Sequence, residues 1–254
     1  MIYLKTPEEV RKIEYVNQLG TEFLLSCYEH LKPGVVTKEL EEMALRFCEK
    51  HKGFPAFKGY RGFPHALCVS INEEVIHGFP SNRVVKEGDL VKVDFGLFKN
   101  GFCSDAAFTK GIGDISNNLT ILLLKGLDGL KRAISKALPG NRFNDISMEI
   151  QSVEDETFSV CRDYVGHGVG FSLHEDPKIY NFVNKSRVNW QLKPGMVFTI
   201  EPIIFQGDFK VKTAVNGWTV LSATNMLSVH FEHSIAILPN GNKVLSRFEG
   251  ITPW

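Results

Sequence analysis

The sequence lacks an excess of either charge, a long apolar run and a low-complexity stretch. Lysine plus arginine and aspartate plus glutamate both number 29, so the formal net charge is zero. A nucleic-acid-binding domain usually carries a basic excess or stripe, so we expect no nucleic-acid partner. The longest aliphatic run, residues 121–124, is far shorter than the roughly 20 residues that span a bilayer, so we expect no membrane segment.

Paired cysteines are also lacking. The five cysteines form an odd set without a C-x-x-C pair, which argues against a disulfide framework and against a thiolate zinc site. Near the amino terminus, Pro7 and the pair Glu8-Glu9 interrupt the apolar stretch that a secretory signal requires. We therefore expect a cytoplasmic protein with reduced thiols.

Helix signals are clear at several points of the chain. Thr6 predicts an N-cap, with Glu9 three residues later completing a capping box. Thr37 is expected to be the N-cap of a second helix. Two further helices are expected, over about 119–138 and after Asn144.

Strand signals alternate with these helices. β-Branched and aromatic residues with a period of two predict strands in the segments 66–76, 90–108, 197–205, 219–221 and 230–238. Hydrophobic residues make up 43% of the chain and charged residues 23%, as in ordinary globular domains. Because no linker divides the sequence, we expect one α/β domain over residues 1–254.

The chain also contains a faint internal repeat. A stretch ending in Asp94 is similar to a stretch ending in Glu201, 107 positions later. A stretch containing His77 aligns with one containing His174, 97 positions later. Two αβ halves related by a pseudo-twofold axis would bring these matched side chains together across a central cleft. A repeat kept for structure alone would preserve core residues rather than acids, so the match indicates a functional site.

A hairpin carries two of the acids. The Asn-Gly turn at residues 100–101 suits a two-residue type I′ turn. Its register places Asp94 opposite Ala107 and Asp105 opposite Gly96, so the two aspartates share one face at roughly 7–8 Å between Cα atoms. Two solvated aspartates on an exposed sheet face are the alternative. Since Asp is depleted in strands and Asp94 ends an apolar run, we favour a pair of cation ligands.

Three further residues have the same character. His167 lies between two glycines, which let the backbone approach a neighbour closely. Glu201 and Glu232 lie in apolar, strand-like runs. Four acids and one imidazole suit Mn²⁺ or Fe²⁺, with Co²⁺ and Zn²⁺ also feasible. Two divalent ions would balance four carboxylates, so we expect a dinuclear centre.

Together these motifs resemble the type I methionine aminopeptidases, in the short bacterial-like form of the pita-bread metallopeptidases, over essentially the whole chain. The resemblance implies an α/β (α+β) pita-bread fold, with two pseudo-twofold-related αβ halves around a central antiparallel sheet. It implies two divalent metal ions (Mn, Fe, Co or Zn) on Asp94, Asp105, His167, Glu201 and Glu232. It implies the catalytic residues His77, His174 and Glu201, and the substrate-binding residues His77, Tyr60, Phe63, Cys68, His174 and Trp218.

The activity implied by this resemblance is removal of the initiator methionine from nascent proteins and peptides, with a preference for a small second residue. Glu201 would shuttle a proton, His174 would donate to the developing oxyanion, and His77 would hydrogen-bond near the scissile nitrogen. A monomer is expected, and nascent chains as substrates are compatible with transient ribosome contact, although the neutral charge gives no visible docking patch.

Departures from the family pattern fall in the substrate pocket. Phe57, Phe63, Phe171 and Leu173 stand where relatives often have other residues. Ordinary core packing is the simpler expectation for Phe57 and Phe171. Two other functions remain open: a related peptidase that cleaves before proline, and a non-catalytic binding protein on the same fold, although such proteins typically lose metal ligands.

Overall fold

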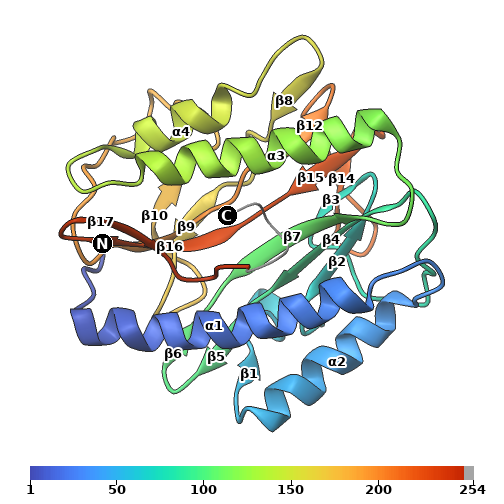
Figure 1. The fold of residues 1–254 in the computed structure, drawn as a ribbon, viewed down its shortest axis with the longest axis horizontal. Helices are drawn as coiled ribbons and strands as arrows, with labels where there is room; N and C mark the ends of the chain where they lie inside the picture. The colour runs from blue at the N-terminus through green and yellow to red at the C-terminus, as the bar shows by residue number, and fades with distance from the viewer. Residues whose placement is uncertain (249–254) are drawn as a thin grey trace.

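Two pairs of helices pack against antiparallel strands in this computed structural model, which describes residues 1–248 (Figure 1). Helices α1 (Pro7–His30) and α2 (Thr37–Lys50) accompany the strands of the first half, at the bottom of Figure 1. Helices α3 (Asn117–Lys136) and α4 (Phe143–Gln151) accompany those of the second half, at the top. This arrangement of two helix pairs about a central layer is the one that the internal repeat predicts.

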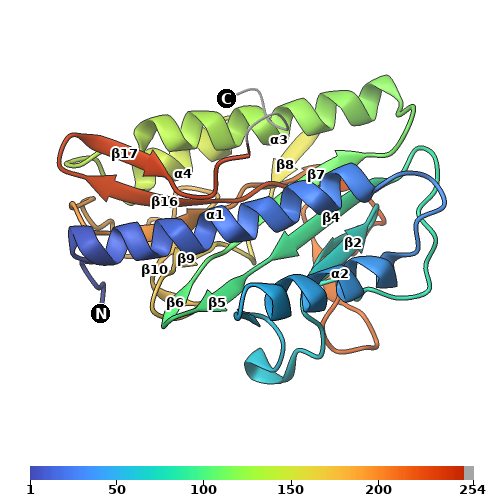
Figure 2. The same cartoon turned by 60° about the horizontal axis from the view of Figure 1, so that its bottom comes forward.

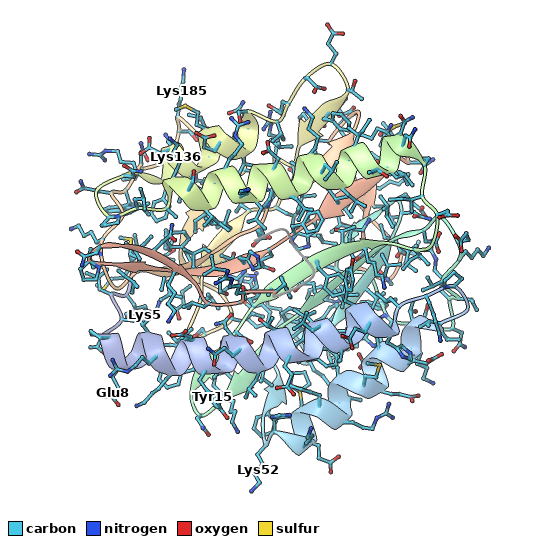
Figure 3. All side chains as sticks on the ribbon, viewed as in Figure 1. Lys5, Glu8, Tyr15, Lys52, Lys136 and Lys185 are labelled. Carbon is cyan, nitrogen blue, oxygen red and sulfur yellow. The ribbon has the colours of Figure 1, made fainter. Side chains whose placement is uncertain are left out.

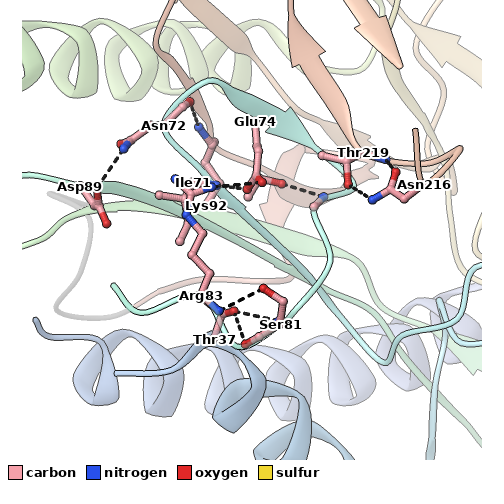
Figure 4. Close-up of polar contacts among 12 residues, drawn as sticks. Thr37, Ile71, Asn72, Glu74, Ser81, Arg83, Asp89, Lys92, Asn216 and Thr219 are labelled. Atoms are coloured by element: carbon pink, nitrogen blue, oxygen red, sulfur yellow. Dashed lines mark hydrogen bonds and ion pairs between the residues drawn. The ribbon is translucent and has the colours of Figure 1, made fainter. Parts of the chain in front are cut away.

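The start of α1 is confirmed as predicted. Thr6 is the N-cap, its hydroxyl accepts from the backbone N–H of Glu9, and the Glu9 carboxylate accepts from the Thr6 N–H at 2.7 Å. The prediction for α2 is wrong by one residue, because Val36 is the N-cap and Thr37 is the first helical residue. The Thr37 hydroxyl instead bonds the backbone of Ser81, accepting from its N–H at 2.9 Å (Figure 4).

The first sheet is built from strands β2 (Cys68–Ile71), β4 (Leu90–Phe95) and β7 (Ala106–Gly111), in the order β2-β4-β7. Beyond Gly96 the β4–β7 hairpin continues as β5 (Leu97–Lys99) and β6 (Phe102–Cys103), with β1 (Phe54–Pro55) at its edge.

The predicted hairpin register is confirmed. Asp94 lies opposite Ala107, and Lys99 lies opposite Phe102. Asn100 and Gly101 have φ angles of 53° and 83°, as a type I′ turn requires.

The second sheet has the order β10-β9-β11-β16-β17 and is antiparallel throughout. Its members are β10 (Glu175–Ile179), β9 (Gly166–Gly168), β11 (Val197–Ile200), β16 (His233–Leu238) and β17 (Gly241–Val244). The short strands around it are β3 (Glu74–Ile76), β8 (Phe158–Val160), β12 (Ile203–Gln206), β13 (Val211–Thr213), β14 (Val220–Ser222) and β15 (Ser228–His230). The segment expected as one strand over 230–238 is therefore divided between β15 and β16.

The two sheets meet where that segment is divided. Glu232 forms an isolated bridge with Ala107, and its backbone N–H donates to the Ala107 carbonyl at 2.9 Å. This bridge joins the hairpin of the first half to the strands of the second half. The central antiparallel layer of a pita-bread fold is formed in this way.

Each helix pair covers its own hydrophobic core. Phe23 of α1 packs on Phe95 of β4, with ring centroids 4.4 Å apart. In the other half Phe143 of α4 packs on Phe198 of β11 at 5.4 Å. In Figure 2, β16, β17 and β7 run between α1 and α3, whereas β4, β5, β6, β9 and β10 lie below α1. Each half therefore turns one face of its strands toward its helix pair and the other toward the space between the halves.

The outer surface carries charged side chains from many elements. Lys52, Lys136 and Lys185 are exposed and project from separate parts of the molecule (Figure 3). Among the described residues no helix is both long enough and apolar enough to cross a membrane.

Candidate metal centre and substrate pocket

A cavity of about 170 Å³ opens between the two halves. Its walls include all of the predicted site residues: Tyr60, Phe63, Cys68, His77, Asp94, Asp105, His167, His174, Glu201, Trp218 and Glu232. The acids and His167 come from strand ends and strand centres of both sheets. Residues that are far apart in the sequence thus face one cavity.

The polar floor of the cavity is compact. Asp105, His167 and Glu232 each offer one ligand atom, and these atoms all lie within 4.8 Å of one another. His167 Nε2 lies 3.5 Å from Asp105 Oδ2 and 3.7 Å from Glu201 Oε1. Asp94 faces the same group, because its carboxyl contacts that of Asp105.

Burial of these acids has a clear electrostatic consequence. Burial, and secondarily the neighbouring carboxylates, raise the pKa of Asp94, Asp105 and Glu232 well above the ordinary range. Burial also raises the pKa of Glu201 to about 7. Four acids packed together without compensation are costly, because like charges in a poorly solvated space repel one another.

A cation would relieve that cost. Asp94 Oδ1, Asp105 Oδ1 and Glu232 Oε1 are buried without a hydrogen-bond partner among the described residues. Carboxylate oxygens with one imidazole nitrogen form a donor set for hard or borderline divalent ions. The residues present therefore fit divalent metal ions.

The two glycines beside His167 have the close backbone approach that the sequence predicts. A Cβ atom at Gly166 would overlap the Thr199 carbonyl oxygen, and one at Gly168 would overlap that of Asp176. The His167 backbone N–H donates to the Thr199 hydroxyl at 3.0 Å. Strand β9 is therefore pressed between its neighbours, which fixes the position of the imidazole.

Hydrogen bonds also orient two of the polar groups. His167 Nδ1 lies 3.0 Å from the Gly168 carbonyl oxygen, which can only accept, so Nδ1 carries the proton and Nε2 faces the acids. The Thr199 hydroxyl donates to Glu201 Oε1 at 2.9 Å. One oxygen of Glu201 is thus held by Thr199.

Two further histidines face the cavity from opposite halves. The His174 ring stacks on Tyr60 at 5.0 Å and lies 4.0 Å from the His167 ring. The His77 ring meets Tyr164 edge-on at 5.7 Å. Burial lowers the pKa of His77 to about 4. Partial burial of the ring, together with the neighbouring His167, lowers the pKa of His174 to about 3, although His174 is more exposed than His77.

The remaining wall is aromatic and apolar. The Phe63 and Trp218 rings meet edge-on at 5.2 Å, and Cys68 lies directly opposite Asp94 in the first sheet. Burial raises the pKa of the Cys68 thiol, so this residue behaves as a small apolar group.

One pocket expectation needs correction. Phe57 is buried in a hydrophobic cluster, as expected, and also lines the cavity, but Phe171, for which core packing was expected too, is 36% exposed. The Phe171 ring lies over the Lys5 ammonium instead, at 5.6 Å. Leu173, the other departure beside His174, does line the cavity.

Sequence reasoning missed several lining residues: Arg61, Ile76, Tyr164, Val165 and His230. His230 is notable because its Nε2 atom is buried without a hydrogen-bond partner among the described residues. This atom lies 3.8 Å from Glu201 Oε2. Its place two positions before Glu232 in an apolar run was a signal that it shares the face of that acid.

Comparisons with known proteins agree with this geometry. Residues 11–239 match the model of metallopeptidase family M24. The methionine aminopeptidase of Clostridium perfringens is 44% identical over 97% of this chain and 99% of its own length. Methionine aminopeptidase 1 of Bacillus subtilis is 44% identical over 97% of this chain and 100% of its own length.

The similarities to solved structures agree with these sequence comparisons. The crystal structure of methionine aminopeptidase from Thermotoga maritima has a TM-score of 0.93 and 39% identity, covering 97% of this chain and 100% of that one. A prolidase from Pyrococcus furiosus shares the fold, with a TM-score of 0.75 and 24% identity over 97% of this chain and 66% of its own. The chain therefore belongs to metallopeptidase family M24, and within it to the methionine aminopeptidases.

Proposed function

We propose that this protein removes the N-terminal methionine from peptides and nascent proteins, with a preference for a small second residue. The observation that carries the proposal is the convergence of four carboxylates and one imidazole on the floor of a cavity with an aromatic wall. The floor suits hydrolysis assisted by metal ions, and the wall suits an apolar side chain.

The proposed metal ligands are Asp94, Asp105, His167, Glu201 and Glu232, which would hold two divalent ions of Mn, Fe, Co or Zn. Two such ions carry four positive charges, which matches four ionised carboxylates. When bound, divalent ions supply Lewis-acid chemistry by polarising a peptide carbonyl and acidifying water.

Glu201 is the proposed proton carrier. Thr199 holds its Oε1 atom, and its Oε2 atom faces the side of the cavity that His230 lines. The Glu201 carboxylate would take a proton from the attacking water and pass it to the leaving amine nitrogen. Proton transfer by a positioned carboxylate contributes typically about 10²–10⁴-fold.

The two facing histidines are proposed to act on the two ends of the scissile bond. His174 would donate a hydrogen bond to the oxygen on which negative charge develops. His77 would hydrogen-bond near the leaving nitrogen. Their approach from opposite halves, with His174 backed by Tyr60 and His77 by Tyr164, supports these separate roles.

The methionine side chain is proposed to lie against Tyr60, Phe63, Cys68 and Trp218. A flexible thioether packs well on aromatic edges and small apolar groups. The preference for a small second residue rests on the size of the cavity, about 170 Å³, which has to accept part of that residue as well.

Further proposals concern domain organisation, oligomeric state and location. We treat residues 1–254 as one catalytic domain that acts as a monomer. Nascent chains as substrates would place it in the cytoplasm, with transient contact to ribosomes.

The test is a peptidase assay on metal-stripped protein reloaded separately with Mn²⁺, Fe²⁺, Co²⁺ or Zn²⁺. Mass spectrometry would follow Met-Gly-Ser, Met-Leu-Ser and an Xaa-Pro dipeptide. We expect metal-dependent release of methionine from Met-Gly-Ser and much slower release from Met-Leu-Ser. Faster cleavage of the Xaa-Pro dipeptide would favour the proline-directed alternative, and full activity without metal would contradict the proposal.

A further inference from the structure

Lys92 is a lysine in a place where lysines are seldom found. It lies in the middle of β4 and is only 2% exposed, whereas lysine is almost never fully buried without a partner. Within residues 1–248 no carboxylate oxygen lies within 4 Å of its Nζ atom. The side chain must therefore be satisfied by neutral groups.

Those neutral groups come from two different parts of the fold. Lys92 Nζ donates to the Asn72 carbonyl oxygen at 2.7 Å and to the Ser228 carbonyl oxygen at 3.0 Å. The Ser228 hydroxyl lies at 3.5 Å. Asn72 belongs to the β2–β3 turn of the first half, and Ser228 begins β15 of the second half. One side chain thus joins backbone from both halves.

The Asn72 end of this link is rigid. Asn72 has a φ of 57°, which asparagine tolerates better than most residues. Its side chain accepts from the Leu90 N–H at 2.9 Å. It donates to Asp89 Oδ1, also at 2.9 Å (Figure 4). These bonds hold the turn in place. The bond from Lys92 to Ser228 therefore ties β15 to a rigid part of the first half.

Both linked segments continue into walls of the proposed substrate cavity. Strand β3 leads from the Asn72 turn to His77, and β15 runs from Ser228 to His230. Both histidines line the cavity, whereas Lys92 does not. The distance between these two walls decides how the peptide sits beside Glu201.

We infer that Lys92 is a positioning residue that fixes the spacing between the His77 wall and the His230 wall. This inference rests on the proposed peptidase function. Without the Lys92 amine, the Asn72 and Ser228 carbonyls lose a shared donor, and the Ser228 end of β15 is no longer tied to the β2–β3 turn. A displacement of about 1 Å at a reacting group can cost about 10²-fold in rate.

The chain offers a matched control in Lys110. This lysine of β7 also donates to two backbone carbonyls, those of Tyr28 and Leu31, at 2.6 and 2.8 Å. It does not line the cavity, and both of its partners lie at the carboxyl end of α1, in Tyr28 and in the C-cap Leu31. Lys92→Met and Lys110→Met each remove an amine that bonds two backbone carbonyls. Only Lys92→Met releases segments that continue into the His77 wall and the His230 wall.

The experiment compares these variants as metal-loaded full-length proteins, with steady-state kinetics on Met-Gly-Ser and with thermal unfolding. We expect both variants to lower Tm, but only Lys92→Met to lower kcat, by about tenfold, with KM changed less than threefold. Equal kcat values for Lys92→Met, Lys110→Met and the wild type, all folded, would overturn the inference, because they would make the Lys92 link purely structural.

A second variant tests the link without relying on the assay. In Lys92→Ala, methylammonium can enter the vacated space and donate to the same carbonyls, whereas tetramethylammonium has no N–H to donate. We expect methylammonium chloride to raise the Tm of Lys92→Ala, relative to equal tetramethylammonium chloride, and to restore part of kcat. For the wild type and for Lys110→Ala, we expect the same Tm in methylammonium chloride as in tetramethylammonium chloride.

These readouts separate the two proposals. If the wild-type protein releases no methionine, the proposed function fails, and the amine-dependent Tm still reports on the Lys92 link. If the wild type is active but Lys92→Ala shows neither a selective Tm shift nor a loss of kcat, the inference about Lys92 fails alone.

Discussion

Lys5 Nζ lies 2.6 Å from Glu175 Oε2, and the two side chains are only 1% and 4% exposed. The other carboxylate oxygen, Glu175 Oε1, accepts from the backbone N–H groups of Phe171 and Ser172 at 2.6 and 3.1 Å. This buried ion pair therefore joins the segment that precedes α1 to the loop that ends in His174.

Replacing Lys5 by methionine tests how much this ion pair contributes to the free energy of unfolding and to kcat. In Lys5→Met the Glu175 carboxylate stays buried without its cation, which typically costs about 3–5 kcal/mol. We expect that loss in the free energy of unfolding, measured by urea denaturation, together with a lower kcat because the His174 loop is released. A surface pair provides the control: Lys243 lies 2.6 Å from Glu14 but is 48% exposed. Lys243→Met should cost about 0–1 kcal/mol and leave kcat unchanged.

Metal binding should depend on the buried acids more than on acids elsewhere. We expect the wild-type protein to bind two equivalents of Mn²⁺, measured by elemental analysis after dialysis, and to gain Tm as Mn²⁺ is added. Asp105→Asn removes one charge from the floor of the cavity and should lower the number of bound ions. Asp208 does not line the cavity, so the control variant Asp208→Asn should bind as much Mn²⁺ as the wild type does. Equal binding by Asp105→Asn would contradict the proposed ligand set.

Loss of the proposed oxyanion donor should affect turnover rather than binding. In His174→Ala we expect kcat on Met-Gly-Ser to fall by about 10²–10³-fold, as is typical when one such donor is removed, with little change in the number of bound metal ions. His30, which pairs with Glu39 at 2.9 Å far from the cavity, supplies the control His30→Ala. Unchanged turnover of His174→Ala would remove the assignment.

The proposed contact surface for the methionine side chain, formed by Tyr60, Phe63, Cys68 and Trp218 and called the methionine slot below, leads to a prediction about specificity. Phe63 and Trp218 support each other edge-on, so Trp218→Ala should open one wall of the slot. We expect KM for Met-Gly-Ser to rise more than kcat falls, because apolar contact with the first side chain is lost. Discrimination between Met and Leu as first residue should also weaken, within the roughly 1–3 kcal/mol that such contacts supply. An unchanged Met-to-Leu ratio would place the side chain elsewhere.

Local signals in the sequence predicted the fold where one residue type decides the backbone. The Asn100-Gly101 turn fixed the register that places Asp94 opposite Ala107, and that prediction is confirmed. The helix predicted from residue 119 begins two residues earlier, at Asn117, because Ser116 is its N-cap. Thr37 was misassigned because its hydroxyl bonds Ser81, a tertiary contact that local pattern does not contain.

What the sequence could not predict depends on contacts between distant segments. Strands β8, β10 and β17 are only three, five and four residues long, too short for an alternating pattern to stand out in the sequence. Glu232 lies between two strands because Ala107 from the other half pairs with it. The Lys92 link and the Lys5–Glu175 pair likewise join residues more than one hundred positions apart. The site residues emerged from the sequence because their chemistry is unusual for strands, whereas their supports have no such mark.

Gly168 gives a prediction in which backbone contact and site geometry are tested together. A Cβ atom there would overlap the Asp176 carbonyl oxygen, and backbone atoms of a paired strand cannot move aside as a flexible side chain does. We expect Gly168→Ala to separate β9 from β10, to destabilise the protein by about 3 kcal/mol and to weaken Mn²⁺ binding, because His167 precedes it. Gly129 in α3 is the matched control: its Cβ would meet only a Val153 methyl group, at 3.2 Å. Gly129→Ala should leave metal binding intact and change stability by less than about 1 kcal/mol, since alanine favours the helix. If Gly168→Ala bound Mn²⁺ as tightly as Gly129→Ala, the close approach of β9 would not be what positions His167.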